Sequence, residues 1–149
     1  FAFRPSVYSE SWPGIREPVP SLTYSFAGAY TGDQAVFSAF QSDLHGAGLS
    51  AFRLVTSGTD FLYALDWQHT SYRFYPHIDF AAHDPEAWAV PILPDGDYSI
   101  FLAPDFSFGV FGHPWEQSIC IFGEPLLRAF APFRPQPFSR LIRRDGQTL

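Results

Sequence analysis

Three short apolar segments separated by tight turns constrain the fold of this chain most strongly. Residues 98–103 and 106–111 meet across Pro104-Asp105, and residues 117–122 follow after the turn GHPWE. Turns this short join antiparallel neighbours, because a parallel connection needs a crossover of a dozen or more residues. The third segment is apolar on both faces, which is typical of a central strand. The sequence therefore predicts an antiparallel meander.

Further strands are predicted before this meander. Residues 22–26 and 61–68 alternate apolar and polar side chains, which is the period of a strand with one buried face. Residues 72–75 follow a short polar turn and are predicted to complete a hairpin with residues 61–68. Residues 52–55 are predicted to form another strand.

The best-defined helix is predicted to begin at Thr31. This threonine is followed three residues later by a glutamine, a pattern that caps the free N–H groups of a helix start. Apolar side chains then recur at helical spacing as far as Leu44. Gly46 and Gly48 are predicted to end the helix, and His45 is expected to interact with its negative end rather than to bind a ligand.

A second, short helix is predicted to open at Glu124, with a proline in its first turn. Strands joined by short turns, with helices before and after them, indicate an α+β fold: a mainly antiparallel sheet of about six strands with two or more helices packed on it. The length of 149 residues suits one core. We therefore expect residues 1–135 to form a single domain and residues 136–149 to form a C-terminal tail.

Composition argues against several classes of partner. The formal net charge is −6 and no basic stripe is present, so a nucleic-acid backbone is not expected to bind. The apolar runs fall far short of the roughly 18 residues of a membrane-spanning helix, and no membrane partner is expected. Cys120 stands alone and cannot form an intramolecular disulfide, which favours a cytoplasmic location. We also expect further residues to precede Phe1 in the natural protein.

Aromatic residues make up 19% of the chain. Each buried aromatic side chain removes roughly 150–250 Å² from water, and a domain of this size would have difficulty burying all of them. We expect most of them to fill the core. The others are expected to serve an interface, with a protein partner or with a second copy in a homodimer.

Two acid–imidazole pairs are the strongest candidates for chemistry. Asp66 precedes His69 by three residues, and His113 precedes Glu116 by the same spacing. If the two bends lie side by side, two imidazoles and two carboxylates would meet, and they could bind a divalent metal or supply a general acid and base. Alternatively, each pair satisfies the amides and carbonyls of its own turn. The spacing is not diagnostic, and we predict neither a bound metal nor a cofactor.

Aromatic side chains are predicted to surround these pairs. Trp67, Tyr72 and Trp115 could form the walls of a small-ligand site, bind a protein partner or belong to the core. The predicted binding residues are therefore Asp66, Trp67, His69, Tyr72, His113, Trp115 and Glu116.

Other reactive groups give weaker signals. Cys120 lies in an apolar segment and is expected to be buried and inert. No serine lies in a G-x-S-x-G pattern, and the glycines are too widely spaced for a phosphate loop. Asp95, Asp97 and Asp105 lie on two turns and are expected to be solvated, because the calcium-loop pattern is absent.

Several short motifs resemble a known family. They are LDWQH at residues 65–69, YRFYP at 72–76, DGDY at 95–98 and, within residues 108–127, FG followed by HPWE and FGEPLL. The chain resembles the bacterial proteins grouped as domain of unknown function 2716, mainly over its second half, with a looser match at residues 1–6. The resemblance implies a bacterial cytoplasmic protein and implies no activity.

Three functions are compatible with these observations. The favoured one is a non-enzymatic module that binds a protein partner through an aromatic, acid-rimmed surface, in a toxin-neutralising (immunity-type) or regulatory role. The second is a small metal-assisted or acid–base hydrolase that uses the two acid–imidazole pairs. The third is a small-ligand binder whose walls are the three aromatic residues named above.

Overall fold

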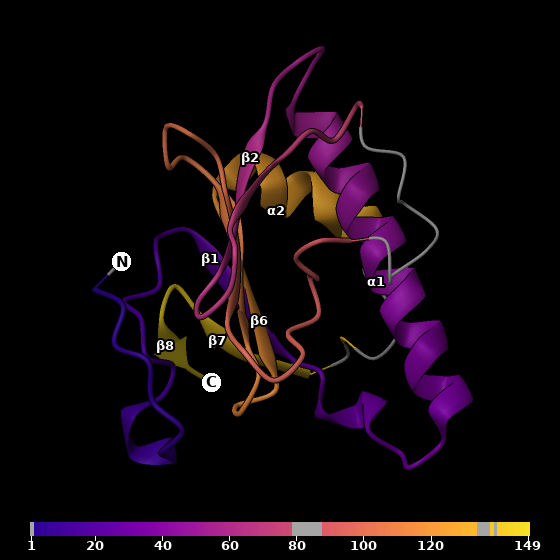
Figure 1. Ribbon diagram of the computed structural model, residues 1–149. Helices are drawn as coiled ribbons and strands as arrows, with labels where there is room; N and C mark the ends of the chain where they lie inside the picture. Colours follow the sequence, from indigo (N-terminus) through magenta and orange to yellow (C-terminus); the bar gives the residue numbers. More distant parts are fainter. Residues whose placement is uncertain (1, 79–87, 134–137, 139) are drawn as a thin grey trace.

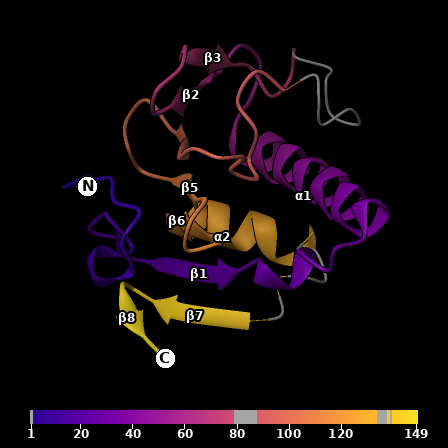
Figure 2. The same cartoon turned by 60° about the horizontal axis from the view of Figure 1, so that its bottom comes forward.

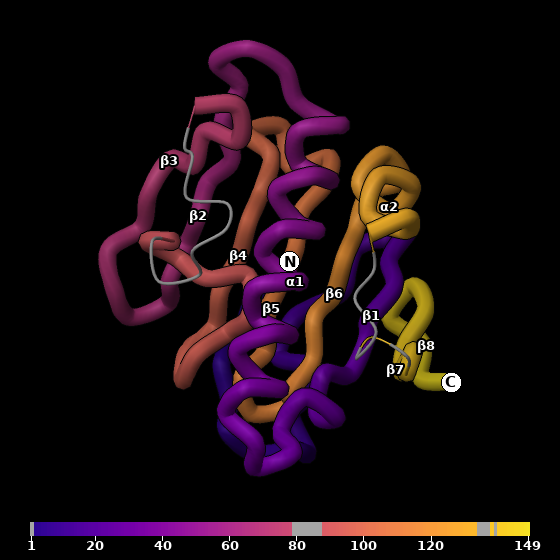
Figure 3. The backbone as a smooth tube through the Cα atoms, turned by 90° about the vertical axis from the view of Figure 1, so that its right-hand side faces the viewer, coloured from indigo at the N-terminus to yellow at the C-terminus, as the bar shows by residue number. Residues whose placement is uncertain are grey.

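One antiparallel sheet of eight strands organises the described part of the chain, which comprises residues 2–78, 88–133, 138 and 140–149 of this computed structural model. The spatial order is β3-β2-β4-β5-β6-β1-β7-β8 (Figure 3). The strands are β1 (Ser21–Ser25), β2 (Leu62–Asp66), β3 (Tyr72–Phe74), β4 (Ser99–Leu102), β5 (Gly109–His113), β6 (Ser118–Phe122), β7 (Arg140–Arg144) and β8 (Gln147–Thr148). The predicted α+β class is confirmed, although the sheet is larger than predicted.

Two α-helices, α1 (Gln34–Val55) and α2 (Glu124–Phe130), pack on one face of this sheet, and the N-terminal segment lies over the other (Figure 1). Short 3-10 turns occur at Ser9–Ser11, Ala27–Ala29 and Ala131–Phe133. Neither of the described α-helices combines the length and the apolar character that crossing a bilayer requires.

Apolar side chains are buried on both faces of the sheet. The cluster under the helices includes Phe26, Phe52, Phe101, Ile119 and Leu126. The cluster on the opposite face consists of Ile15, Tyr98, Leu102, Phe111, Cys120 and Phe122. Because both faces are covered, β5 and β6 are buried at every position, which confirms the predicted central strand.

Helix α1 is longer than the sequence indicates. Asp33 caps its first turn by accepting a hydrogen bond of 2.8 Å from the N–H two residues further on, and the helix continues to Val55. The predicted strand at residues 52–55 was therefore wrong. The ring of Phe52 stacks on Phe101 of β4 with 5.4 Å between centroids, so this segment packs on the sheet as the last turn of the helix.

Two glycines that were predicted to end this helix lie inside it. Gly48 lies against Ile92, where an added Cβ would collide with the isoleucine side chain, whereas Gly46 has open space beside it. The predicted interaction of His45 with the helix end was also wrong. His45 is fully buried in the middle of the helix, where its Nδ1–H donates to the carbonyl of Gln41 (2.7 Å) and its Nε2 accepts from the N–H of Ile92 (3.1 Å). Burial lowers its pKa and so favours the neutral ring.

Residues 136–149 were expected to form a tail, but their described part supplies β7 and β8. Strand β7 lies beside β1, and β8 lies beside β7 (Figure 2). Phe138 is fully buried and stacks on Tyr24 with 5.4 Å between centroids. The expectation was wrong because the strand buries Arg143, so its polarity does not alternate as in a simple amphipathic strand. The division of the chain into domains stays a prediction.

Candidate functional site

The strand register places the two histidine-bearing bends at the same end of the sheet. Asp66 at the end of β2 pairs with Ser99, and Ser99 pairs with Gly112 near the end of β5. The turn that follows β2 and the turn that follows β5 are therefore separated by β4 alone. This confirms the predicted hairpins and puts the candidate residues of both turns into one region.

The ring of Tyr98, just before β4, lies between the two bends. Its centroid is 5.8 Å from that of Trp67, 5.1 Å from that of Trp115 and 4.8 Å from that of His113, and each pair meets edge to face. The Tyr98 hydroxyl donates to the carbonyl of Ser6 and accepts from its N–H, both at 2.9 Å. Tyr98 therefore joins the two bends and also holds the N-terminal segment on this face of the sheet.

Two tryptophans reach the surface at this place. Trp67 is 44% exposed and Trp115 is half-buried. Phe3 meets Trp67 and Tyr98 edge to face, with centroids 6.4 and 5.0 Å apart. We call Trp67 and Trp115, together with Phe3 and Tyr98, the tryptophan surface.

Tyr72 belongs to the opposite side of the β2–β3 hairpin. It pairs directly with Ala64, which is buried in the cluster under the helices, so both side chains point to that face. Trp67 lies an odd number of residues from Ala64 and contacts Phe3 on the other face. Tyr72 is 47% exposed, but it is not part of the tryptophan surface.

His69 is a highly exposed side chain that meets two carboxylates. Its Nδ1 is 2.9 Å from Oδ1 of Asp66 and 3.7 Å from Oδ2 of Asp97. The hydrogen bond to Asp66 raises the pKa of the imidazole above its ordinary value. Asp97, which was expected to be a solvated turn acid, is only 8% exposed, so that expectation was wrong.

The second pair, His113 and Glu116, is held by its own turn and by the end of the chain. Nδ1 of His113 accepts a hydrogen bond of 3.1 Å from the N–H of Glu116. The ring is fully buried, and Trp12 covers it with 5.4 Å between centroids. Burial lowers the pKa of His113 to about 4, so the ring is neutral near pH 7. Its Nε2 has no hydrogen-bond partner among the described residues.

The carboxylate of Glu116 is bound by Arg143 of β7. Two hydrogen bonds of 2.6 and 2.7 Å join the guanidinium to both carboxylate oxygens, and Ser118 donates a third. Burial opposes ionisation of Glu116, but the bonds from Arg143 and Ser118 outweigh it and lower its pKa. The Nε–H of Arg143 also donates to Glu17 (2.8 Å), which accepts a further bond from Thr23 (2.9 Å).

Sequence reasoning missed Glu17 and Arg143. They are 126 positions apart, and neither lies near a motif that singled out the other candidates. The only available signal was that a strongly polar segment near the C-terminus contained Leu141 and Ile142, which could dock on a sheet.

The two acid–imidazole pairs share one end of the sheet but do not form one polar site. Within the described ranges, the potential metal ligands with atoms within 4.8 Å of one another are Asp66, His69 and Asp97. His113 and Glu116 are not in that group, and no hydrogen bond or ion pair between described residues joins them to it. The meeting of two imidazoles and two carboxylates was one of two alternatives, and within the described ranges the pairs belong instead to two separate clusters.

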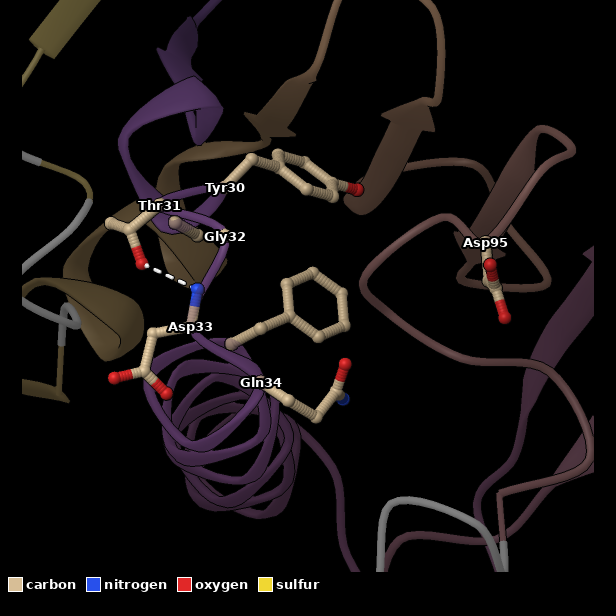
Figure 4. Close-up of a pocket in the computed structure, with 8 residues that line it drawn as sticks. Tyr30, Thr31, Gly32, Asp33, Gln34 and Asp95 are labelled. Atoms are coloured by element: carbon tan, nitrogen blue, oxygen red, sulfur yellow. Dashed lines mark hydrogen bonds between the residues drawn. The ribbon is translucent and has the colours of Figure 1, made fainter.

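A pocket of about 490 Å³ opens at the start of α1 (Figure 4). Tyr30 and Gln34 border it from one side and Asp95, from the loop before β4, from the other. Burial and the nearby Asp95 raise the pKa of Tyr30, so its hydroxyl is un-ionised near pH 7. The Asp33 carboxylate is engaged as the cap of α1. None of the predicted binding residues lines this pocket.

The remaining candidates are structural. Cys120 is 1% exposed, and burial raises the pKa of its thiol to about 12, which confirms the predicted buried cysteine. Asp105 accepts hydrogen bonds from the N–H and the hydroxyl of Ser107 and is exposed, as expected for a turn acid.

Comparison with known proteins gives the family. The family model described as "Protein of unknown function (DUF2716)" matches residues 1–127. The chain belongs to this family. The predicted resemblance is thereby confirmed. The DUF2716 match contains the tryptophan surface and both acid–imidazole pairs, whereas Arg143 lies beyond it.

One relative is similar to part of the chain. An uncharacterised protein of Bacillus subtilis (strain 168), YxiI, is 48% identical over 88 residues, which is 59% of this chain and 54% of that protein. The chain thus spans about half the length of this relative. No solved structure matches the chain. The DUF2716 description names no activity.

Proposed function

We propose that this protein is an interaction module that binds a protein partner through the tryptophan surface. The observation that carries the proposal is the placement of Trp67 and Trp115 against one buried ring, Tyr98, at distances of 5.8 and 5.1 Å. Tryptophan and tyrosine dominate the binding energy of many interfaces, because a rigid ring buries a large area with little loss of conformational freedom. Trp67 is 44% exposed, so this area is free to be buried by a partner.

The charge around the surface favours a basic partner. Asp66 adjoins Trp67 in the sequence and Asp97 adjoins Tyr98, while the whole chain has a formal net charge of −6. Complementary charge speeds association and excludes wrong partners. The partner is therefore a protein that presents arginine or lysine around an apolar contact. An immunity-type or regulatory role in the cytoplasm would suit such binding, because the chain is small and acidic and has a single cysteine.

The other two functions receive less support from the geometry. A hydrolase that uses both acid–imidazole pairs would need His113 and Glu116 free to reach a substrate, yet His113 is fully buried and Glu116 is bound by Arg143. A small-ligand site with Trp67 and Tyr72 as walls would need both on one side of the hairpin, but they point to opposite faces.

The test compares three baits: the wild-type chain, Trp67→Ala/Trp115→Ala, and Leu54→Ala as a matched control. Leu54 lies near the end of α1 and is 64% exposed. Its substitution therefore removes an exposed apolar side chain that lies outside the tryptophan surface. Proteins cross-linked to the wild type in a host lysate are identified, purified and titrated against each bait. We expect the double variant to weaken binding by about 30-fold or more, which corresponds to a hot-spot loss of about 2 kcal/mol, and Leu54→Ala to leave it unchanged.

Equal affinity of the wild type and the double variant for the captured partner would overturn the proposal, and so would the failure of the wild type to retain any partner. Light scattering of the wild type tests whether a second copy of the chain binds to the tryptophan surface. A dimer that dissociates in Trp67→Ala/Trp115→Ala but not in Leu54→Ala would assign the surface to a homodimer and overturn the basic-partner proposal.

A further inference from the structure

Three potential metal ligands meet beside the tryptophan surface, from two turns that are 28 positions apart. Asp66 is the last residue of β2, His69 lies in the turn that follows it, and Asp97 comes from the turn before β4. One imidazole nitrogen and two carboxylate oxygens lie within 4.8 Å of one another. The cluster contains none of the four rings of the tryptophan surface, although Asp66 and Asp97 also supply the negative charge that the proposed basic partner would meet.

The most informative member of the cluster is Asp97. Its side chain is only 10% exposed, and Oδ1 accepts a hydrogen bond of 2.8 Å from the N–H of Tyr98. That bond fixes the orientation of the carboxylate and directs Oδ2 towards His69, at 3.7 Å from Nδ1. The imidazole of His69 faces Oδ2 and is a cation only when it is protonated. A carboxylate with so little exposure to water is costly to leave without donors or a cation.

The spacing of the three atoms is close to that of a metal site. Bonds of about 2.0–2.2 Å to nitrogen and oxygen place neighbouring ligand atoms roughly 3.0–3.5 Å apart in tetrahedral or octahedral geometry. The distance from Nδ1 of His69 to Oδ1 of Asp66 is 2.9 Å, and its distance to Oδ2 of Asp97 is 3.7 Å. The exposed His69 side chain can supply the small adjustment, while Asp97 is held in place by its backbone bond.

We propose that Asp66, His69 and Asp97 bind a divalent first-row transition-metal ion, with Zn²⁺ as the representative. An imidazole nitrogen favours zinc, nickel or copper over magnesium and calcium, which prefer sites made of oxygen alone. Three protein ligands leave at least one coordination position for water or for a group from another molecule. The ion would join the β2–β3 turn to the start of β4 and so fix the position of Trp67, which lies between two of the ligands in the sequence.

The experiment titrates the chain, free of tag and of metal, with Zn²⁺ by calorimetry and with Co²⁺ by visible absorption. We expect one ion per chain with a Kd of about 10 µM or tighter, and weaker binding of Mg²⁺ and Ca²⁺. His69→Ala and Asp97→Asn should each weaken Zn²⁺ binding by about 10- to 100-fold or more. Asp95→Asn is the matched control, since Asp95 is an exposed acid on the same turn outside the cluster, and its affinity should equal that of the wild type.

A second measurement separates a lost ligand from a damaged fold. Zn²⁺ should raise the Tm of the wild type and of Asp95→Asn but not of His69→Ala, whose Tm without metal should stay close to that of the wild type because His69 is exposed. Failure of the wild type to bind Zn²⁺, or equal binding by His69→Ala and Asp97→Asn, would overturn the proposal. Either result leaves partner binding by the tryptophan surface as a separate question.

Discussion

The guanidinium of Arg143 donates two hydrogen bonds, of 2.6 and 2.7 Å, to the carboxylate of Glu116. Arg143 lies on β7 and Glu116 in the turn between β5 and β6, so one ion pair connects the last part of the chain to the candidate site. The same guanidinium donates to Glu17 at 2.8 Å. One buried carboxylate and one that is mostly buried thus depend on the same cation, and removing a single partner leaves their charge without compensation.

Replacing Arg143 is therefore expected to destabilise the fold strongly. Arg143→Met keeps much of the side-chain volume but leaves Glu17 and Glu116 without their donor. We expect the free energy of unfolding in urea at pH 7 to fall by about 3–5 kcal/mol. Arg144→Met is the control, because Arg144 is exposed on the same strand, and it should change stability by less than about 0.5 kcal/mol. Equal effects of the two substitutions would contradict the buried network.

Stability should decrease as the pH falls below the ordinary pKa of histidine. Burial holds the pKa of His113 at about 4, well below 6.5, and also lowers that of His45. Between these values the unfolded chain binds more protons than the folded chain, so stability is complete above pH 6.5 and is lost as the pH falls towards 4. Each histidine contributes a slope of at most about 1.4 kcal/mol per pH unit in this window.

Urea unfolding at pH 7.5, 6.0 and 5.0 measures this dependence. The variant His113→Asn keeps an acceptor for the N–H of Glu116 but has no imidazole to titrate at this position. Its stability should therefore change less with pH than that of the wild type, and the remaining pH dependence should include the contribution of His45. His69→Asn is the control. The pKa of His69 is raised by Asp66, which gives a contribution of opposite sign, so this substitution should not flatten the curve. If the free energy of unfolding had the same pH dependence in the wild type and in His113→Asn, the lowered pKa of the buried His113 would be ruled out.

The sign of one glycine substitution distinguishes the observed helix from the one predicted from sequence. Gly46 lies inside α1 and has open space where a Cβ would be added. We expect Gly46→Ala to stabilise the fold by about 0.5–1 kcal/mol, because alanine loses less conformational freedom in a helix. If the chain left the helix at Gly46 in the left-handed conformation, the same substitution would destabilise it. Thermal unfolding of the two chains decides between these outcomes.

The elements with local signals were predictable from sequence. The meander from Ser99 to Phe122, the β2–β3 hairpin and the Pro-initiated α2 each follow from alternation and turn residues within a few positions. The length of α1 was not predictable, because the tertiary contact between Gly48 and Ile92 makes a glycine favourable inside the helix. Local propensity gives no information on such a contact.

The candidate site was predicted only in part, for the same reason. Motif spacing drew attention to both histidine-bearing bends, and the register does bring them to one end of the sheet. The sequence did not indicate that Tyr98 would lie between them, nor that Arg143 would take up the Glu116 carboxylate. Both relationships depend on pairings between distant segments, which residue types alone do not specify.

The hydroxyl of Tyr98 is expected to hold the N-terminal segment on the sheet. It donates to the carbonyl of Ser6 and accepts from its N–H, while its ring stacks on Phe111 with 5.6 Å between centroids. Tyr98→Phe keeps the stacked ring and removes only the two hydrogen bonds, so we expect a loss of about 1–2 kcal/mol. The loss should be concentrated in the first residues of the chain, because those bonds attach them to the sheet.

Amide hydrogen exchange measures this local effect. The N–H of Arg4, which donates to the carbonyl of Gly14, should exchange faster in Tyr98→Phe, whereas the amides of β5 and β6 should change only by the global loss of stability. Tyr63→Phe is the control. Tyr63 lies on the same face of the sheet as Tyr98, and its hydroxyl forms no hydrogen bond within the described residues. If Arg4 exchanged equally in both variants, the N-terminal segment would be held by ring packing alone, and its attachment would not depend on the hydroxyl of Tyr98.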